Sequence, residues 1–147
     1  VTINTPSMLC VEDYLDALRW ADSAGGLDAL CARSQQNLEV IAEWVAATPW
    51  IDFLAGEQET RSNTSICMKI RAPWFLALDG DEQAVVTKRM SALLDEEGVA
   101  YDINGYRNAP PGLRVWGGAT VESEDMAKLI PWLEWAYAQV VPETVTD

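Results

Sequence analysis

Thr64-Ser65-Ile66-Cys67-Met68-Lys69-Ile70 is the stretch that decides the fold, because apolar and polar side chains alternate along it. Side chains two residues apart point to the same face of a β-strand, which places Ile66, Met68 and Ile70 together on one side. Isoleucine is also enriched in strands. The pattern therefore predicts a strand over residues 64–70 with its large apolar side chains on one face.

The sequence on both sides of this strand alternates between helical and extended patterns. Helices are expected where apolar residues recur every three or four positions, over residues 11–24, 27–47, 82–96 and 124–140. Further short strands are expected over residues 50–54, 99–103 and 113–116. Gly25-Gly26 and Gly98 are expected to end the helices before them, and Pro131 to kink or divide the last helix.

The predicted order is therefore two helices, two strands, a helix, two strands and a helix. This order indicates an α+β fold, in which a small, mainly antiparallel sheet is covered by helices. A chain of 147 residues fits a single domain, with a frayed tail expected over residues 142–147. The chain begins with Val1 rather than Met. This is expected if the chain is part of a longer protein, and also if its terminus has been processed.

Composition excludes several classes of function. The chain has 10 Lys and Arg against 23 Asp and Glu, and its net charge of −13 disfavours binding to nucleic acids or anionic membranes. It has no histidine, which removes Ser-His-Asp and Cys-His catalytic groups and most catalytic zinc sites. Cys10, Cys31 and Cys67 lack zinc-ligand spacing, so no metal is expected, and they are predicted to be free, buried thiols in a reducing cytoplasm.

Carboxylates and lysines offer no convincing catalytic group. Asp79 and Asp81 form a possible acid–base pair, but they precede a predicted helix, where a capping role is favoured. A Schiff-base lysine requires a desolvated pocket or cationic neighbours. Lys69, Lys88 and Lys128 all lie in polar or solvent-facing contexts of the predicted elements. No catalytic residue is therefore assigned on this chain.

Two arginines bracket a stiff turn, Pro110-Pro111-Gly112, that fixes their separation. Guanidinium groups bind carboxylates and phosphates through two parallel hydrogen bonds, so Arg107 and Arg114 indicate a ligand with two anionic groups. The alternative is that both form surface ion pairs. Trp116 follows Arg114 by two positions and is expected on the same face of its strand.

The N-terminal segment, residues 1–10, contains a cluster of small polar groups in Ile3-Asn4-Thr5-Pro6-Ser7. One interpretation is an Asx turn that leads into the first helix. The other is a phosphate clamp, because amide, hydroxyl and backbone N–H groups all donate to phosphate oxygens. Local sequence leaves both interpretations open.

Three segments together resemble the C-terminal part of the phosphoserine aminotransferases, which belong to the class V family of pyridoxal-phosphate enzymes. They are INTPSML (Ile3–Leu9), RSNTSICMKI (Arg61–Ile70) and YDINGYRNAPPGLRVWGGATVESEDMAKLIPWLEWA (Tyr101–Ala136). The resemblance covers nearly the whole chain. It implies the small C-terminal domain of a cytoplasmic, homodimeric transaminase that moves an amino group between glutamate and phosphohydroxypyruvate in serine biosynthesis.

The resemblance also implies roles for individual residues. Asn4 and Thr5 match an Asn-Thr pair that binds the phosphate of pyridoxal phosphate held mainly by the partner subunit. Arg114 matches the arginine that holds the α-carboxylate of the substrate, and Arg107 matches one that contacts the substrate phosphate. Tyr106 stands where the family has a histidine beside that second arginine, and its hydroxyl can still donate a hydrogen bond.

The family's Schiff-base lysine and the aspartate that pairs with the cofactor ring lie in a preceding large domain, and nothing in this chain corresponds to them. The chain alone is therefore expected to be inactive. Two alternatives stay open. One is a complete, non-catalytic α+β module that binds an amino acid or another dianionic metabolite, and the other is a class V aminotransferase with a different substrate.

Overall fold

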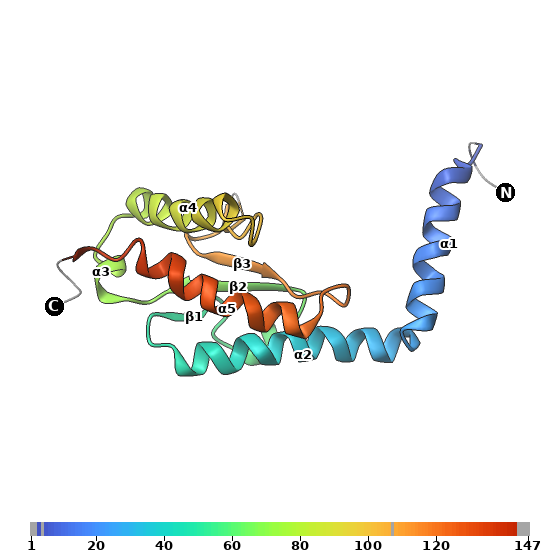
Figure 1. The fold of residues 1–147 in the computed structure, drawn as a ribbon, viewed down its shortest axis with the longest axis horizontal. Helices are drawn as coiled ribbons and strands as arrows, with labels where there is room; N and C mark the ends of the chain where they lie inside the picture. The colour runs from blue at the N-terminus through green and yellow to red at the C-terminus, as the bar shows by residue number, and fades with distance from the viewer. Residues whose placement is uncertain (1–2, 4, 107, 144–147) are drawn as a thin grey trace.

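The computed structural model of the chain describes residue 3 and residues 5–106 and 108–143. These residues form a small antiparallel sheet with helices around it (Figure 1). The elements in chain order are α1 (Met8–Ser23), α2 (Gly26–Ala47), β1 (Ile51–Phe53), the short 3-10 helix η1 (Gln58–Thr60), β2 (Ser65–Ile70), α3 (Pro73–Leu76), α4 (Gly80–Glu96), β3 (Leu113–Trp116) and α5 (Ser123–Ala138). The predicted α+β class is confirmed.

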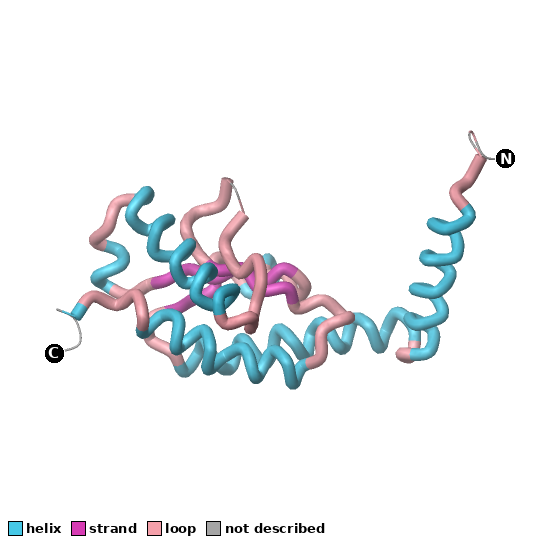
Figure 2. Tube along the Cα trace, turned by 45° about the horizontal axis from the view of Figure 1, so that its top comes forward, coloured by secondary structure: helices cyan, strands magenta, loops and turns pink. Residues whose placement is uncertain are grey.

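β2 is the central strand, with β1 and β3 antiparallel on its two sides. Met68 lies opposite Phe53 of β1 and opposite Leu113 of β3, so apolar residues of the three strands line up in a row across the sheet. Ile66, Met68 and Ile70 are all buried, as the alternation in the sequence predicted. Figure 2 shows the three strands side by side in the middle of the molecule.

One face of the sheet is buried and the other is not. The buried face joins α2, α4 and α5 in one hydrophobic cluster, to which Ile41, Met90 and Leu133 contribute from the three helices. The remaining strand side chains form what we call the open face, and none of them is buried. The open face consists of Asp52, Ser65, Cys67, Lys69, Arg114 and Trp116.

Local sequence signals explain where the helices begin and end. The side chain of Asp79 accepts a hydrogen bond from the backbone N–H of Glu82, and Glu82 accepts one from the N–H of Asp79 in return. This reciprocal capping box confirms the capping role expected of Asp79. Gly25 and Gly26 have φ angles of 105° and 75°, which only glycine adopts without cost, and they make the turn between α1 and α2.

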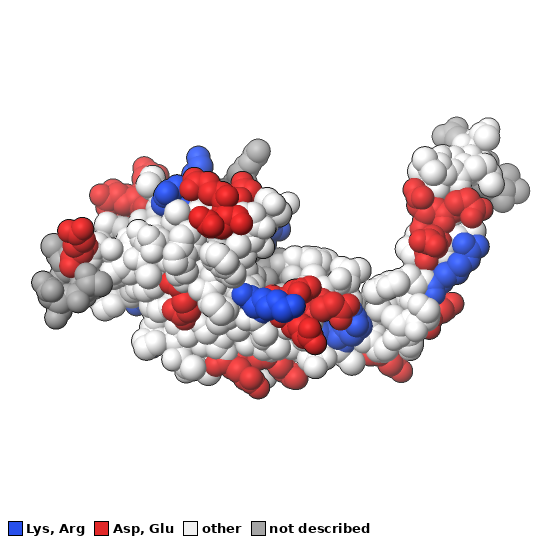
Figure 3. All heavy atoms as spheres, in the orientation of Figure 1, with Lys and Arg blue, Asp and Glu red and all other residues white. Residues whose placement is uncertain are grey.

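α1 stands away from the rest of the molecule and touches it near the start of α2 (Figure 1). None of its residues is buried. Val11, Tyr14, Leu15 and Leu18, which the helical pattern places on one face, are all exposed. Acidic side chains outnumber basic ones on the visible surface of the molecule, including α1 (Figure 3). The fold thus leaves an apolar helix face without a partner within this chain.

The strand expected over residues 99–103 is not formed. Asp102 has a φ angle of +55°, which is incompatible with an extended strand at this position. Pairing with β3 is limited to an isolated bridge between Asn104 and Leu113 and a hydrogen bond of 2.8 Å from the Arg114 N–H to the Ile103 carbonyl. The sheet therefore has three strands rather than four within the described part of the chain.

Of the two outcomes expected at Pro131, division of the last helix is wrong, because α5 runs through it as a single element. A kink at Pro131 stays a prediction. Proline removes one helical hydrogen bond, but Met126 and Leu133, on either side of it, are both buried in the core. Tertiary packing therefore overrides the local break. The short helix α3 was not predicted, although Pro73 in its first turn is a typical helix start. Residues 144–147 lie outside the described residues, so the frayed tail stays a prediction.

All three cysteines are free, as expected. The prediction that they are buried is wrong for Cys10 and Cys31, which are exposed on the two helices that border the Gly25-Gly26 turn, and Cys67 is only half-buried. The described residues contain no cluster of side chains suited to a metal ion. Among them there is also no helix with the length and apolarity needed to cross a membrane.

Candidate functional site

Arg114 lies on the open face of β3, opposite Cys67 of β2. The strand alternation that buries Leu113 and Val115 turns the Arg114 side chain away from the core. There it lines a cavity of about 270 Å³ together with Ser65, Tyr101, Asp102, Ile103 and Trp116. The predicted placement of Arg114 and Trp116 on one face is confirmed.

The guanidinium of Arg114 is only partly satisfied by the protein. Its Nη2 forms an ion pair with Oδ2 of Asp102. Its Nε is buried and has no hydrogen-bond partner among the described residues. The ring of Tyr106 lies 5.6 Å from Cζ of Arg114, within the range of a cation–π contact. A buried guanidinium N–H without an acceptor is an unsatisfied donor, and an oxyanion is the kind of acceptor that suits it.

Trp116 forms one wall of this cavity, and it is 59% exposed. Its ring lies directly over Gly118, where an added Cβ would come within 2.5 Å of Cζ2 of the indole. Glycine is therefore required at this position for the ring to keep its place. The Gly-Gly pair that follows β3 thus has a local steric reason, which the sequence alone did not reveal.

The loop that follows β3 is held by α2. Asn37 is fully buried, and its Nδ2 donates to the carbonyl oxygens of Gly117, Gly118 and Val121 at 3.1, 3.3 and 3.0 Å. Its Oδ1 accepts a hydrogen bond of 2.8 Å from the Ser123 hydroxyl. The sequence analysis missed Asn37, and the signal it offers is a polar residue on the apolar face of a predicted helix.

A second contact from α2 supports the same loop. Arg33 donates from Nε to the Ala119 carbonyl at 2.8 Å and pairs through Nη2 with Glu122 at 2.5 Å. Arg33 and Asn37 are four residues apart, so they lie on one side of α2. The segment between β3 and α5 is therefore attached to α2 at both of these positions.

The other predicted site residues are only partly brought together. Tyr106 lies beside Arg114 but is 72% exposed, and Arg107 lies outside the described residues. Asn4 is also outside them. Thr5 is exposed and precedes α1, which carries it to the end of the molecule far from the sheet (Figure 1). Arg114 and Tyr106 thus form one site, and Thr5 belongs to a different region of the chain.

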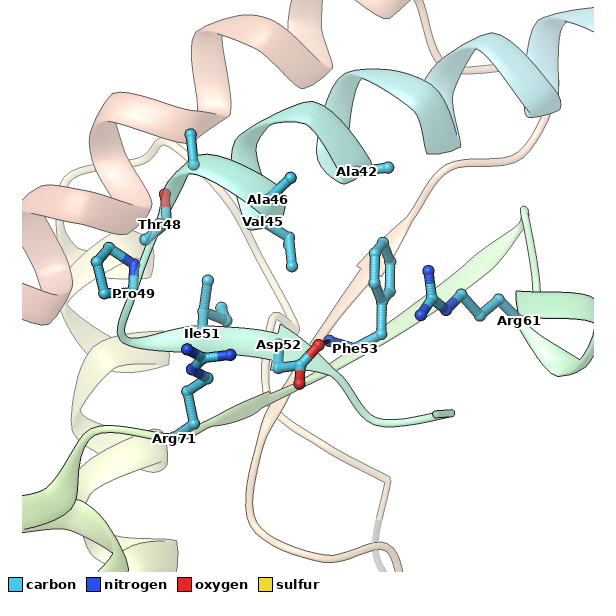
Figure 4. Close-up of a pocket in the computed structure, with 11 residues that line it drawn as sticks. Ala42, Val45, Ala46, Thr48, Pro49, Ile51, Asp52, Phe53, Arg61 and Arg71 are labelled. Atoms are coloured by element: carbon cyan, nitrogen blue, oxygen red, sulfur yellow. Dashed lines mark hydrogen bonds between the residues drawn. The ribbon is translucent and has the colours of Figure 1, made fainter. Parts of the chain in front are cut away.

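Another cavity, of about 440 Å³, lies between the C-terminal end of α2 and β1 (Figure 4). Two arginines line it, but Arg61 donates to the carbonyls of Ala55 and Gly56, both at 3.2 Å, and its Cζ lies 4.2 Å from the centre of the Phe53 ring. Arg61 is therefore a structural residue. Arg71 alone does not make this cavity an anion site comparable to that of Arg114.

Comparison with known proteins gives relatives of one kind. No family model matches the chain. Phosphoserine aminotransferase of Methanosarcina mazei is 49% identical over 136 residues, and that of Methanosarcina barkeri is 50% identical over 136 residues. Both matches cover 92% of this chain and 34% of the relative. The chain thus spans about a third of the length of the curated relatives that it matches.

Solved structures with a similar fold include phosphoserine aminotransferase from Bacillus circulans subsp. alkalophilus, with a TM-score of 0.74 and 18% identity. A phosphoserine aminotransferase examined for radiation damage of its Schiff base has a TM-score of 0.72 and 17% identity. Each match covers 92% of this chain, and 34% and 35% of those chains respectively. By sequence and by fold, this chain is therefore related to a segment that makes up about a third of a phosphoserine aminotransferase.

Proposed function

We propose that this chain is the C-terminal small domain of a transaminase that exchanges the amino group between glutamate and phosphohydroxypyruvate, with Arg114 holding the substrate carboxylate. The single observation that carries the proposal is Arg114 itself, whose side chain lines a cavity on the open face and whose buried Nε has no hydrogen-bond partner among the described residues. The near 50% identity to phosphoserine aminotransferases of Methanosarcina supports the substrate class.

The chemistry at Arg114 fits a carboxylate. A carboxylate has two oxygens that can accept from Nε and Nη2 of one guanidinium along the same edge. Such a ligand would satisfy the buried Nε, which the protein leaves without a partner. In a transaminase the protein contributes orientation of this kind, because it must hold the amino acid in one pose while the cofactor reacts.

We assign a phosphate on the same ligand to Tyr106 and, from the sequence resemblance, to Arg107. The centre of the Tyr106 ring lies 5.6 Å from Cζ of Arg114, and Tyr106 is exposed, so its hydroxyl is open to a group bound next to the carboxylate. Pro110-Pro111-Gly112 connects this segment to β3, and Gly112 passes so close to the Met68 carbonyl that a Cβ would lie 2.3 Å from it. That close approach fixes the start of β3 relative to the loop.

Pyridoxal phosphate is the cofactor that the proposal implies, and it supplies the electron sink of transamination. We assign Asn4 and Thr5 to its phosphate group. Thr5 is exposed and its hydroxyl makes no hydrogen bond within the described part of the chain, so it is available as a donor. Arg114 lies far from Thr5, which agrees with a cofactor phosphate that belongs mainly to the site of a partner subunit.

The exposed face of α1 supports a larger assembly. Val11, Tyr14, Leu15 and Leu18 form an apolar stripe that a monomer of this chain leaves in water. We propose that the large domain of the same enzyme and a second subunit of a homodimer cover this region. Exposed free thiols at Cys10 and Cys31 fit a reducing, cytoplasmic location.

The test is steady-state kinetics of the complete aminotransferase that contains this chain. An ionic hydrogen-bonded contact contributes about 1.5–3 kcal/mol, so Arg114→Ala should lower kcat/KM for phosphoserine about 10- to 150-fold. Arg89→Ala, which removes an exposed arginine paired with Glu96, is the matched control and should leave kcat/KM unchanged. Equal values for Arg114→Ala and the control would refute the carboxylate role.

The substrate class needs a separate comparison. The same enzyme should turn over phosphoserine far better than alanine, because only phosphoserine has a second anionic group to engage Tyr106 and Arg107. Preference for alanine would indicate a different class V aminotransferase. A complete protein without any transaminase activity, but with calorimetric binding of phosphoserine, would indicate the non-catalytic module instead.

A further inference from the structure

Asp102 occupies the position of a ligand at Arg114. It lies in the loop between α4 and β3, and its Oδ2 contacts Nη2 of Arg114. It is also the one non-glycine residue with a positive φ angle, +55°, among the described residues. Aspartate tolerates this left-handed conformation better than most residues, but at some cost. A carboxylate held in a costly backbone conformation against an arginine calls for an explanation.

We propose that Asp102 is a built-in competitor of the substrate carboxylate, which neutralises Arg114 while the site is empty and is displaced when a carboxylate binds. The inference rests on the proposed role of Arg114 as the carboxylate anchor. It assigns Asp102 as the residue that sets how tightly the site binds a carboxylate.

The contact of Asp102 is weaker than that of an incoming carboxylate. Asp102 engages Nη2 and leaves the buried Nε without a partner. The side chain of Asp102 is 81% exposed, so water screens its charge, whereas that of Arg114 is 26% exposed. A free carboxylate that enters the cavity lined by Arg114 competes with Asp102 for the same guanidinium, so the Asp102 charge lowers its affinity.

The exchange requires only the Asp102 side chain to move. The next residue, Ile103, is buried, and its carbonyl accepts a hydrogen bond of 2.8 Å from the Arg114 N–H. Asn104 is paired with Leu113 in an isolated bridge. These backbone contacts keep the loop against β3, so the exposed Asp102 carboxylate can rotate into water while Arg114 stays in place.

The experiment is an NMR titration of the 147-residue chain with sodium acetate at constant ionic strength, observed at the Nε–H resonance of Arg114. Asp102→Asn removes the charge, keeps the size, and keeps a residue type that tolerates a positive φ angle. Because an exposed ion pair contributes little, we expect Asp102→Asn to tighten acetate binding about 2- to 5-fold. The proposal is overturned if Asp102→Asn does not bind acetate more tightly than the natural chain, including the case in which neither protein binds it.

Two further variants locate the effect. Asp95→Asn removes an equal charge from the exposed end of α4, and Asp95 forms no ion pair among the described residues. It should leave acetate binding unchanged, and tightening equal to that of Asp102→Asn would show a general charge effect and overturn the proposal. In the Arg114→Ala background the titration is followed at the indole N–H of Trp116, which lines the same cavity. Addition of Asp102→Asn should have no effect on acetate binding there, and any tightening would also overturn the proposal.

This inference and the proposed function can fail separately. Acetate has no phosphate or amino group, so its titration tests the competition at Arg114 and not transamination. If Asp102→Asn tightens acetate binding but Arg114→Ala leaves kcat/KM of the complete enzyme unchanged, the competitor role stands and the proposed function falls. If Arg114→Ala abolishes turnover but Asp102→Asn leaves acetate binding unchanged, the proposed function stands and the competitor role falls.

Discussion

Replacement of Asn37 by leucine tests whether α2 holds the loop behind the candidate site. Asn37 is fully buried and joins three carbonyl oxygens of that loop, those of Gly117, Gly118 and Val121. Leucine has the same branched skeleton as asparagine but is larger, so the substitution removes the hydrogen bonds without opening a cavity and adds some overpacking at this buried position. Loss of stability in Asn37→Leu would therefore report mainly on the polar contacts, with a smaller contribution from packing.

The magnitude follows from the groups that lose a partner. The Gly118 carbonyl keeps a backbone hydrogen bond of 2.9 Å from the Val121 N–H, so its loss is partial. The carbonyls of Gly117 and Val121 lose the Asn37 donor, and a buried polar group without a partner costs about 1–3 kcal/mol. The amide of Asn37 itself no longer has to be desolvated, which offsets part of this cost. We expect a net decrease of about 2–4 kcal/mol in the free energy of unfolding.

The assay is urea unfolding of the chain followed by tryptophan fluorescence, with Gln36→Leu as the matched control. Gln36 is the exposed neighbour of Asn37 on α2, and its replacement should change stability by no more than about 0.5 kcal/mol. Faster hydrogen exchange at the Val121 amide should accompany the loss in Asn37→Leu. A decrease below about 1 kcal/mol, or one equal to that of Gln36→Leu, would refute the reasoning.

Three further substitutions test other contacts. Glu134→Gln should lower the free energy of unfolding, measured in urea, by about 1–3 kcal/mol. Glu134 accepts hydrogen bonds from the indole N–H groups of Trp44 and Trp50 at 2.7 and 3.0 Å, and an amide has only one acceptor oxygen. An unchanged free energy of unfolding would contradict this. Gly118→Ala should shift the indole N–H resonance of Trp116, since the new Cβ would lie 2.5 Å from the ring, and an unchanged resonance would disprove the packing. Asp79→Ala should cost about 1 kcal/mol of unfolding free energy through loss of the cap on α4, and an unchanged urea midpoint would argue against that cap.

The fold was predictable from sequence where one local signal acted alone. Alternation placed β2, and the Gly25-Gly26 turn separated two helices correctly. The failures occurred where tertiary contacts compete with local preference. Pro131 remains inside α5 because the flanking side chains are buried, and the extended pattern of residues 99–103 is interrupted at Asp102. Neither outcome is encoded in the immediate neighbours of these residues.

The sequence predicted Arg114, Trp116 and Tyr106 of the candidate site, but not Asp102, which meets Arg114 from another loop. Arg114 was identified because an arginine beside a Pro-Pro-Gly turn is an unusual local pattern, and its strand placed Trp116 on the same face. Asp102 and Asn37 were missed because their partners are 12 residues and at least 80 residues away in sequence, respectively. A sequence pattern gives the direction of a side chain on its own element, but it does not give the residue from another element that meets it.

The face of the sheet on which a residue lies determines whether its substitution affects ligand binding or the stability of the fold. Arg114 lies on the open face and Val115, its neighbour, lies in the core, so loss of the Arg114 side chain removes the proposed anion site without removing core contacts. Asn37 is a buried residue whose substitution should affect both properties. The loop that it holds is continuous with β3 and contains Gly118, which lies under the Trp116 ring. A substitution at Asn37 should therefore weaken both stability and carboxylate binding, whereas one at Arg114 should weaken binding alone.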